Sequence, residues 1–290
     1  MAPSPQPSAT TSIISGSHSN TDAESGDALL HRTSYWEWLN QDVDPNDTTF
    51  PLTAYSFMTG YMDVISFSAC FVWCGFQTGN FCQLAIAIAR LYEGPKLLQD
   101  HTFRTADKQA LTSLLSFQVG SAFGRLGDRI GNHKRIYLVL GTFLQALLTM
   151  AAALTLWKSH QPSVSNDRDD PAWTNILTFV GLAFMSASLG VQGVIGKRLN
   201  TQFGTTIVLT TIWVELASDP NLFKLNRKVP SRDHKLFAAS FLFIGGFLGR
   251  SLVGSIGTPA ALGIGCGARV LIALSFLFCK TKEPKPDRIQ

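Results

Sequence analysis

Residues 136–157, IYLVLGTFLQALLTMAAALTLW, contain no Asp, Glu, Lys or Arg. The windows 64–89 and 171–196 lack these four residue types as well. A bilayer core about 30 Å thick needs about 20 mainly apolar residues per helix, so each window is long enough to span it. A chain of 290 residues has too few polar segments to bury so many apolar windows inside a soluble core. The windows therefore predict a polytopic membrane protein.

The distribution of charge supports this prediction and divides the chain. Only 15% of the residues are charged, whereas soluble domains carry about 25%. Residues 1–50 hold a single basic residue, Arg32, and are rich in Ser, Thr, Pro and Asp, which is typical of a disordered polar tail. We expect a transmembrane domain over 51–280 and a short basic C-terminal tail over 281–290.

Eight apolar segments define an expected all-α bundle of six to eight transmembrane helices. Two of the segments are short enough to enter the membrane without crossing it. With eight crossing helices, the side holding both termini would also receive 93–108, 158–171 and 218–235 and would carry fifteen Lys and Arg residues against five. The positive-inside rule then predicts cytoplasmic termini. The expected helices cover 52–74, 78–92, 109–125, 136–157, 172–195, 204–217, 236–254 and 260–279.

Similar motifs recur in the same order along the chain, which predicts an internal two-fold repeat with halves at about 51–157 and 172–280. If each half contains four crossing helices the halves are parallel, and if a short helix does not cross they are inverted. Both arrangements occur in secondary transporters. The matching motifs are the segments around Asp63 and Gln192, Thr78-Gly79-Asn80 and Thr210-Thr211-Ile212, and Gly120-x-x-x-Gly124-Arg125 and Gly245-x-x-x-Gly249-Arg250.

Two further patterns suggest contacts. The small residues at Gly120 and Gly124, and at Gly245 and Gly249, let helices approach closely, so we expect them to pack helices. The loop 224–235, KLNRKVPSRDHK, is basic and suits anionic lipid headgroups. It is too short and too close to the bilayer for nucleic-acid binding.

The combination of Gly60-Tyr61-Met62-Asp63, Thr78-Gly79-Asn80 and Gly190-Val191-Gln192 resembles the YoaK-like family. These are multi-span membrane proteins of bacteria and fungi, catalogued as a domain of unknown function. The similarity covers roughly residues 50–280. It implies an integral membrane protein of about six or seven helices, and it assigns no substrate, cofactor or catalytic residue.

Asp63 is the first candidate site residue, because a carboxylate in the middle of a membrane helix costs about 2.5–3.5 kcal/mol and calls for a function or a partner. Three roles remain open. Asp63 could bind a proton or cation coupled to transport, form an ion pair with Arg250 or Arg269, or be a neutral acid whose pKa burial has raised.

Four other polar residues complete the candidate binding or coupling set. Thr78 and Asn80 flank Gly79 between two apolar helices, where they indicate either a broken helix that lines a cavity or a tight turn at the membrane face. Gln192 could hydrogen-bond a helix or a solute. Arg250 could bind an anionic solute or extend to the interface.

The sequence contains no pattern typical of an enzyme, a cofactor or a metal site. His-Glu-x-x-His and Gly-x-Ser-x-Gly are missing, and every histidine lies in a tail or loop. Cys70 and Cys74 share a helix face without further ligands nearby. We therefore expect a small-solute secondary transporter or permease. The alternative is a membrane scaffold or assembly factor whose buried charges only fix helix packing.

Overall fold

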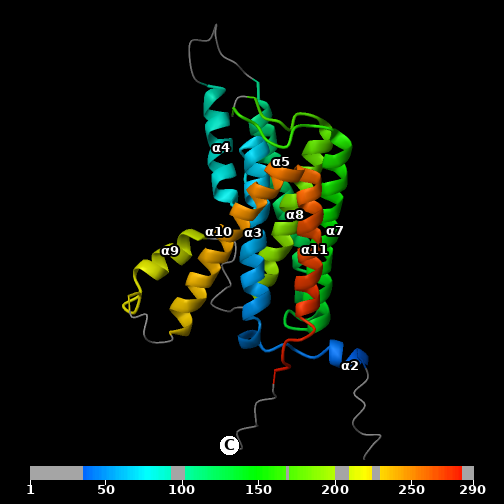
Figure 1. Cartoon of the computed structure of the whole chain (residues 1–290), viewed down its shortest axis with the longest axis vertical. Helices are drawn as coiled ribbons and strands as arrows, with labels where there is room; N and C mark the ends of the chain where they lie inside the picture. Colours follow the sequence, from blue (N-terminus) through cyan, green and yellow to red (C-terminus); the bar gives the residue numbers. More distant parts are fainter. Residues whose placement is uncertain (1–34, 93–101, 168–169, 200–208, 224–228, 283–290) are drawn as a thin grey trace, which may run out of the picture. The chain divides into compact units, whose positions relative to one another are not determined.

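The computed structural model of the chain describes residues 35–92, 102–167, 170–199, 209–223 and 229–282 (Figure 1). The expected tails at 1–34 and 283–290 lie outside these residues. The chain divides into two units, 1–38 and 39–290, and the helices below belong to the second. A short helix α2, Tyr35–Leu39, lies at the junction of the units. The helices are α3 (Thr49–Cys70), α4 (Gln77–Arg90), α5 (Thr105–Gly124), α6 (Gly127–Ile130), α7 (Arg135–Ser159), α8 (Ile176–Leu199), α9 (Leu209–Ala217), α10 (Pro230–Ile256) and α11 (Thr258–Ser275), with a 3-10 turn at Pro45–Asp47.

The predicted all-α class is confirmed, and the described residues contain no strand. The helix boundaries follow local signals. Helix α3 ends where Phe71 adopts a left-handed conformation, with φ at 57°. Helix α10 begins with Pro230, whose missing N–H costs nothing at a first helical position. Gly257, with φ at 79°, separates α10 from α11; a left-handed residue there costs little when it is glycine.

The two ends of unit 39–290 lie at the same end of the bundle. The Val43 N–H donates to the carbonyl of His133 at 2.9 Å, and the Asp44 N–H donates to the carbonyl of Lys280 at 2.9 Å. The Lys282 N–H returns a bond to Asp42 at 2.8 Å. Residues 39–48, which the sequence assigns to the polar tail, are therefore hydrogen-bonded to the helical domain.

The loop between α7 and α8 lies at the opposite end. There the backbone N–H groups of Ser165 and Ala172 bind the carbonyls of Ser68 and Ala69 at the end of α3, both at 2.9 Å. The layout with eight crossing helices, which grouped 158–171 with the termini, is therefore wrong. That layout requires α4 to cross the bundle, whereas α4 begins partway along it, just after Gly75 binds Asp63 of α3.

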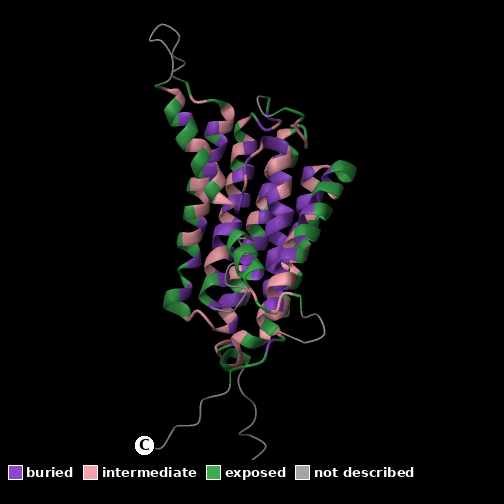
Figure 2. Cartoon of the chain, turned by 90° about the vertical axis from the view of Figure 1, so that its left-hand side faces the viewer, coloured by how far each residue is buried: buried purple, intermediate pink, exposed green. Residues whose placement is uncertain are grey.

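The long helices pack in two close pairs, α3 with α10 and α5 with α8, while α7 contacts both α8 and α11. The buried side chains concentrate along the facing sides of these helices (Figure 2). Helix α3 buries polar residues as well as apolar ones, including Thr59, Asp63 and Ser66. Polar groups inside the bundle need hydrogen-bond partners, so α3 is where a site is expected.

The outward sides of the helices are apolar. Phe243 and Phe247 on α10 are 74% and 64% exposed, and Leu147 and Leu154 on α7 are more than half exposed. Among the described residues, four helical segments are long and apolar enough to cross a bilayer: Arg135–Ser159, Ile176–Leu199, Pro230–Ile256 and Thr258–Phe278. Because exposed apolar surfaces of this extent are unfavourable in water, the protein is a membrane protein surrounded by lipid.

Candidate functional site

The first polar region is the junction between α3 and α4. After Phe71 the chain turns back along α3, and the Gly75 N–H donates to Oδ1 of Asp63 at 2.6 Å. Asp63 lies two helical turns before the end of α3, so α4 begins partway along the bundle, near the depth of Asp63, rather than at the end of the bundle. Residues 71–76 are therefore non-helical backbone at membrane depth, which is tolerated only where protein buries it or a cavity adjoins it.

Asn80 holds this junction in place. Its Nδ2 donates to the Trp73 carbonyl at 2.6 Å, and its Oδ1 accepts from the Trp73 N–H at 3.2 Å. The same amide donates to Ser113 Oγ on α5 at 3.1 Å, and Ser113 in turn pairs with Ser186 on α8 at 2.9 Å. The junction is thus tied to both neighbouring helices, and Asn80 satisfies main-chain groups that have no helical partner.

The second polar region surrounds Arg269 of α11, which is 0% exposed. Its Nη1 donates to Oε1 of Gln145 on α7 and, at 3.2 Å, to Oε1 of Gln192 on α8. Its Nη2 donates to Ser188 Oγ on α8 at 3.4 Å. We call Arg269, Gln145, Gln192 and Ser188 the arginine cluster; it joins three helices.

Helix α3 fixes the two glutamines of the arginine cluster. Gln192 Nε2 donates to the Tyr55 carbonyl at 3.0 Å and to Thr59 Oγ1 at 2.8 Å. Gln145 Nε2 donates to the Tyr55 hydroxyl at 3.2 Å, and that hydroxyl also pairs with Thr142 at 2.5 Å. Because the amide nitrogens are used on α3, the amide oxygens must face the guanidinium.

The arginine cluster lacks a counter-charge. The partners of Arg269 are neutral, and within the described part of the chain no carboxylate reaches ion-pair distance from its guanidinium. Its Nε is buried and donates to no described protein atom. In the other region, Oδ2 of Asp63 is likewise buried and accepts from none. Isolated buried charges are costly, so both atoms mark positions of interest.

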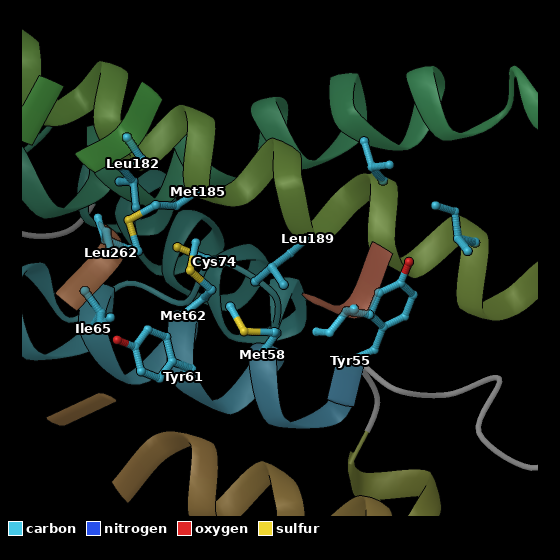
Figure 3. Packing of buried hydrophobic residues seen from close by; sticks show 14 of the residues in the cluster. Tyr55, Met58, Tyr61, Met62, Ile65, Cys74, Leu182, Met185, Leu189 and Leu262 are labelled. Carbon is cyan, nitrogen blue, oxygen red and sulfur yellow. The ribbon is translucent and has the colours of Figure 1, made fainter. Parts of the chain in front are cut away.

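Soft apolar side chains lie between the two regions. Figure 3 shows Met58 and Met62 of α3 facing Met185 and Leu189 of α8, with Cys74 beside them. The Cys74 side chain is buried in this core, one residue before Gly75. Methionine is flexible and fills irregular spaces, so this part of the core can repack more easily than one built from branched residues.

The predicted site residues separate into three locations. Asp63 and Asn80 meet at the junction, while Gln192 lies in the arginine cluster. Thr78 and Arg250 are exposed on the outside of α4 and α10. Arg269, which the sequence suggested only as a partner for Asp63, forms instead the centre of the second region. The signal for it was present, since it is the only charged residue within 251–279.

The four predicted packing glycines lie in the two close helix pairs. A side chain at Gly120 would collide with the carbonyl of Ala187, and one at Gly124 would press against Val194, both on α8. On α10, Gly245 faces the carbonyl of Phe57 and Gly249 that of Tyr61, both on α3. These contacts bring the backbones of each pair together.

Two other predictions concern loops and metals. Residues 224–228 of the basic loop lie outside the described residues. In its described part, Arg232 binds Asp233 at 2.6 Å and Lys235 binds Glu215 of α9 at 3.2 Å. A search of the described residues finds no group of three or more His, Cys, Asp or Glu side chains that could hold a metal ion.

The fold and its buried polar regions define a helical integral membrane protein. A family model described as Protein of unknown function (DUF1275) matches residues 52–275, which is most of the chain. The chain belongs to this family, and the resemblance to the YoaK-like family is confirmed. No curated protein and no solved structure matches the chain.

Proposed function

We propose that the protein is a secondary transporter of a small solute, built from two inverted halves. In this interpretation α3, α4, α5 and α7 correspond to α8, α9, α10 and α11. The helix contacts support the correspondence, because exchanging the halves converts the pair α3 and α10 into the pair α8 and α5. Both pairs use glycines at the contact, with Gly60 facing Leu242 and Gly190 facing Phe117.

The helix directions support inversion rather than a parallel repeat. Helix α3 begins at the end where residues 42–44 meet 280–282, whereas α8 finishes at that end, where Arg198 binds Asp128 at 2.8 Å. Corresponding helices therefore run in opposite directions (Figure 1). Inverted halves are a common design of secondary transporters, in which rocking of one half against the other gives alternating access.

The observation that carries the proposal is the start of α4 partway along the bundle, near the depth of Asp63. Interrupted helices of this kind form solute and ion sites near the midplane of transporters. A protein that serves only as a scaffold has no need for the hydrogen bonds that residues 71–76 require from Asp63 and Asn80.

The charges favour an orientation with the termini in the cytoplasm. Among the described residues, the end that contains the termini of unit 39–290 carries ten Lys and Arg, whereas Arg90, Arg104, Lys108 and Lys158 lie at the other end. The positive-inside rule assigns the more basic end to the cytoplasm. The ten residues are Arg125, Arg129, Lys134, Arg135, Lys197, Arg198, Arg232, Lys235, Lys280 and Lys282.

The rate at which Cys74 becomes accessible to water tests the transporter proposal. Cys74 is 0% exposed, so a charged methanethiosulfonate reagent reaches it only when the bundle opens. In a variant that keeps Cys74 as its sole cysteine, we expect modification in liposomes much faster than global unfolding, measured by mass spectrometry. A matched variant keeping only Cys70, which is also buried and is the last residue of α3, reports general loosening. Protection of Cys74 for as long as the fold persists would favour the scaffold.

A further inference from the structure

We propose that the arginine cluster binds a small monovalent oxyanion, of the carboxylate or nitrate type, through Arg269. The inference deepens the proposed function and rests on it for the movement of the anion, whereas binding itself depends only on the cluster. Arg269 lies on α11, and the cluster with its supporting residues draws on α3, α7 and α8. The site therefore lies between the two proposed halves, where rocking would expose it.

The positive charge of Arg269 favours a bound anion. A guanidinium stays protonated in proteins, so Arg269 brings a full positive charge into the bundle. The oxygens of Gln145, Gln192 and Ser188 stabilise it as dipoles but do not neutralise it. Asp63 does not serve as the counter-ion, because its carboxylate accepts from the Gly75 N–H and stays beyond ion-pair distance. A bound anion would supply the missing negative charge.

The geometry of the remaining N–H donors of Arg269 suits a planar oxyanion. Nη1 directs its hydrogen bonds to the two glutamines. Nη2 has one long bond of 3.4 Å, and Nε has none with described protein atoms. The Nε–H and the neighbouring Nη2–H are parallel and form the fork that a planar oxyanion accepts with two oxygens. The occupied side of the guanidinium holds it in place, and the Nε–H on the other side makes no hydrogen bond with a described protein atom.

The guanidinium of Arg269 is held rigidly in one orientation, which favours binding. Both glutamine oxygens face Arg269 because α3 takes their amide hydrogens, so the fork keeps one direction without a ligand. The core formed by α3 and α8 contains Met58, Met62 and Met185, whose flexible side chains can repack when a ligand of a few atoms enters the bundle (Figure 3). Since Arg269 is fully buried, the anion enters only when the bundle opens.

Thermal unfolding of the full chain in uncharged detergent tests binding without transport. Sodium formate and sodium nitrate are added at constant ionic strength, with sodium HEPES, whose anion is too large for the site, as the balance. A ligand that binds the folded state raises the unfolding midpoint with its concentration. We expect both anions to do so for the wild type and for Arg129→Lys, which alters an exposed arginine outside the candidate site.

Two variants assign the effect to the cluster. Arg269→Lys keeps the charge and loses the fork, so formate should bind about ten- to a hundredfold more weakly. Gln145→Glu places a permanent carboxylate against Nη1, and the Tyr55 hydroxyl can turn to donate to it. This variant should fold stably without added anions and should no longer respond to them, which keeps the test valid if Arg269→Lys does not fold.

Each outcome separates the two proposals. A wild-type midpoint that neither anion raises would overturn the anion site, as would an equal response in Gln145→Glu. Anion binding combined with a Cys74 that stays protected would leave the site and remove the transporter. Rapid modification of Cys74 without any anion response would leave the transporter and remove the anion site.

Discussion

Two buried charged residues, Asp63 and Arg269, are held in different ways. Asp63 is bound by a backbone N–H only twelve residues away, within a junction that its own neighbours build. Arg269 is bound by side chains 77 to 124 residues away, on two other helices. The difference teaches that position in the membrane alone does not define a role. Asp63 shapes the chain locally, whereas Arg269 is presented by the assembled bundle to whatever enters it.

The largest expected effect on stability comes from disrupting the two close helix pairs, α3 with α10 and α5 with α8. Gly120→Leu and Gly245→Leu place side chains against backbone carbonyls of α8 and α3, so we expect each to lower the free energy of unfolding by more than about 3 kcal/mol. Gly263→Leu is the control, since a Cβ added there meets no atom within 4 Å. Denaturation in mixed micelles measures the three variants. Equal stability of all three would mean that the two close helix pairs are not formed.

The next effect tests the junction alone. Asn80→Ala leaves the N–H of Trp73 without its partner and removes one of the two donors to the Trp73 carbonyl, which keeps its bond from Ser113 Oγ at 2.7 Å; the loss should cost about 2–3 kcal/mol. Thr78→Ala, two residues away on the exposed side, should change stability by less than about 0.5 kcal/mol. A loss of similar size in both variants would contradict a specific role for Asn80.

A smaller effect distinguishes structure from coupling at Asp63. Asp63→Ala removes the acceptor of the Gly75 N–H and should cost about 1–3 kcal/mol. Asp63→Asn retains an oxygen for that bond, so we expect a loss below about 1 kcal/mol and unchanged reaction of Cys74. If Asp63→Asn keeps its stability but stops the opening that Cys74 reports, Asp63 is a coupling residue.

The smallest expected effect on stability is at Arg269. Arg269→Met removes an uncompensated buried charge, although it also leaves two glutamine oxygens without a donor. These contributions oppose each other, and we expect a change below about 1 kcal/mol in anion-free buffer together with loss of the anion response. A loss above about 3 kcal/mol in calorimetry would make Arg269 a structural residue like Asn80.

The sequence predicted the positions of helices well where composition alone determines them. Windows without charge located α7 and α8 closely, because the part of a helix that crosses the hydrocarbon core disfavours charge and both helices carry charged residues only near their ends. The end of α3 was missed, since residues 71–74 are as apolar as the helix before them and only the left-handed Phe71 ends it. The motif at Thr78–Asn80 marked the break, although the backbone leaves the helix before it.

The arginine cluster could not be predicted in the same way. Its contacts join residues from α7, α8 and α11, and no periodicity in a single chain segment reports which polar side chains of different helices meet. The lone charge at Arg269 showed that a partner was needed, and the sequence offered Asp63 as the obvious one. Two neutral glutamines were closer once the chain folded.

The hydrogen bonds that join residues 42–44 to 133 and 280–282 also limit how the molecule can move. They join the segment before α3 to the segment after α11. Arg135 strengthens this connection by donating to the Cys279 carbonyl at 2.7 Å. At the far end a single residue, Gly257, links α10 and α11. Separation of the helices at the Gly257 end leaves these hydrogen bonds intact. Separation at the end where residues 42–44 and 280–282 meet requires the hydrogen bonds to break first.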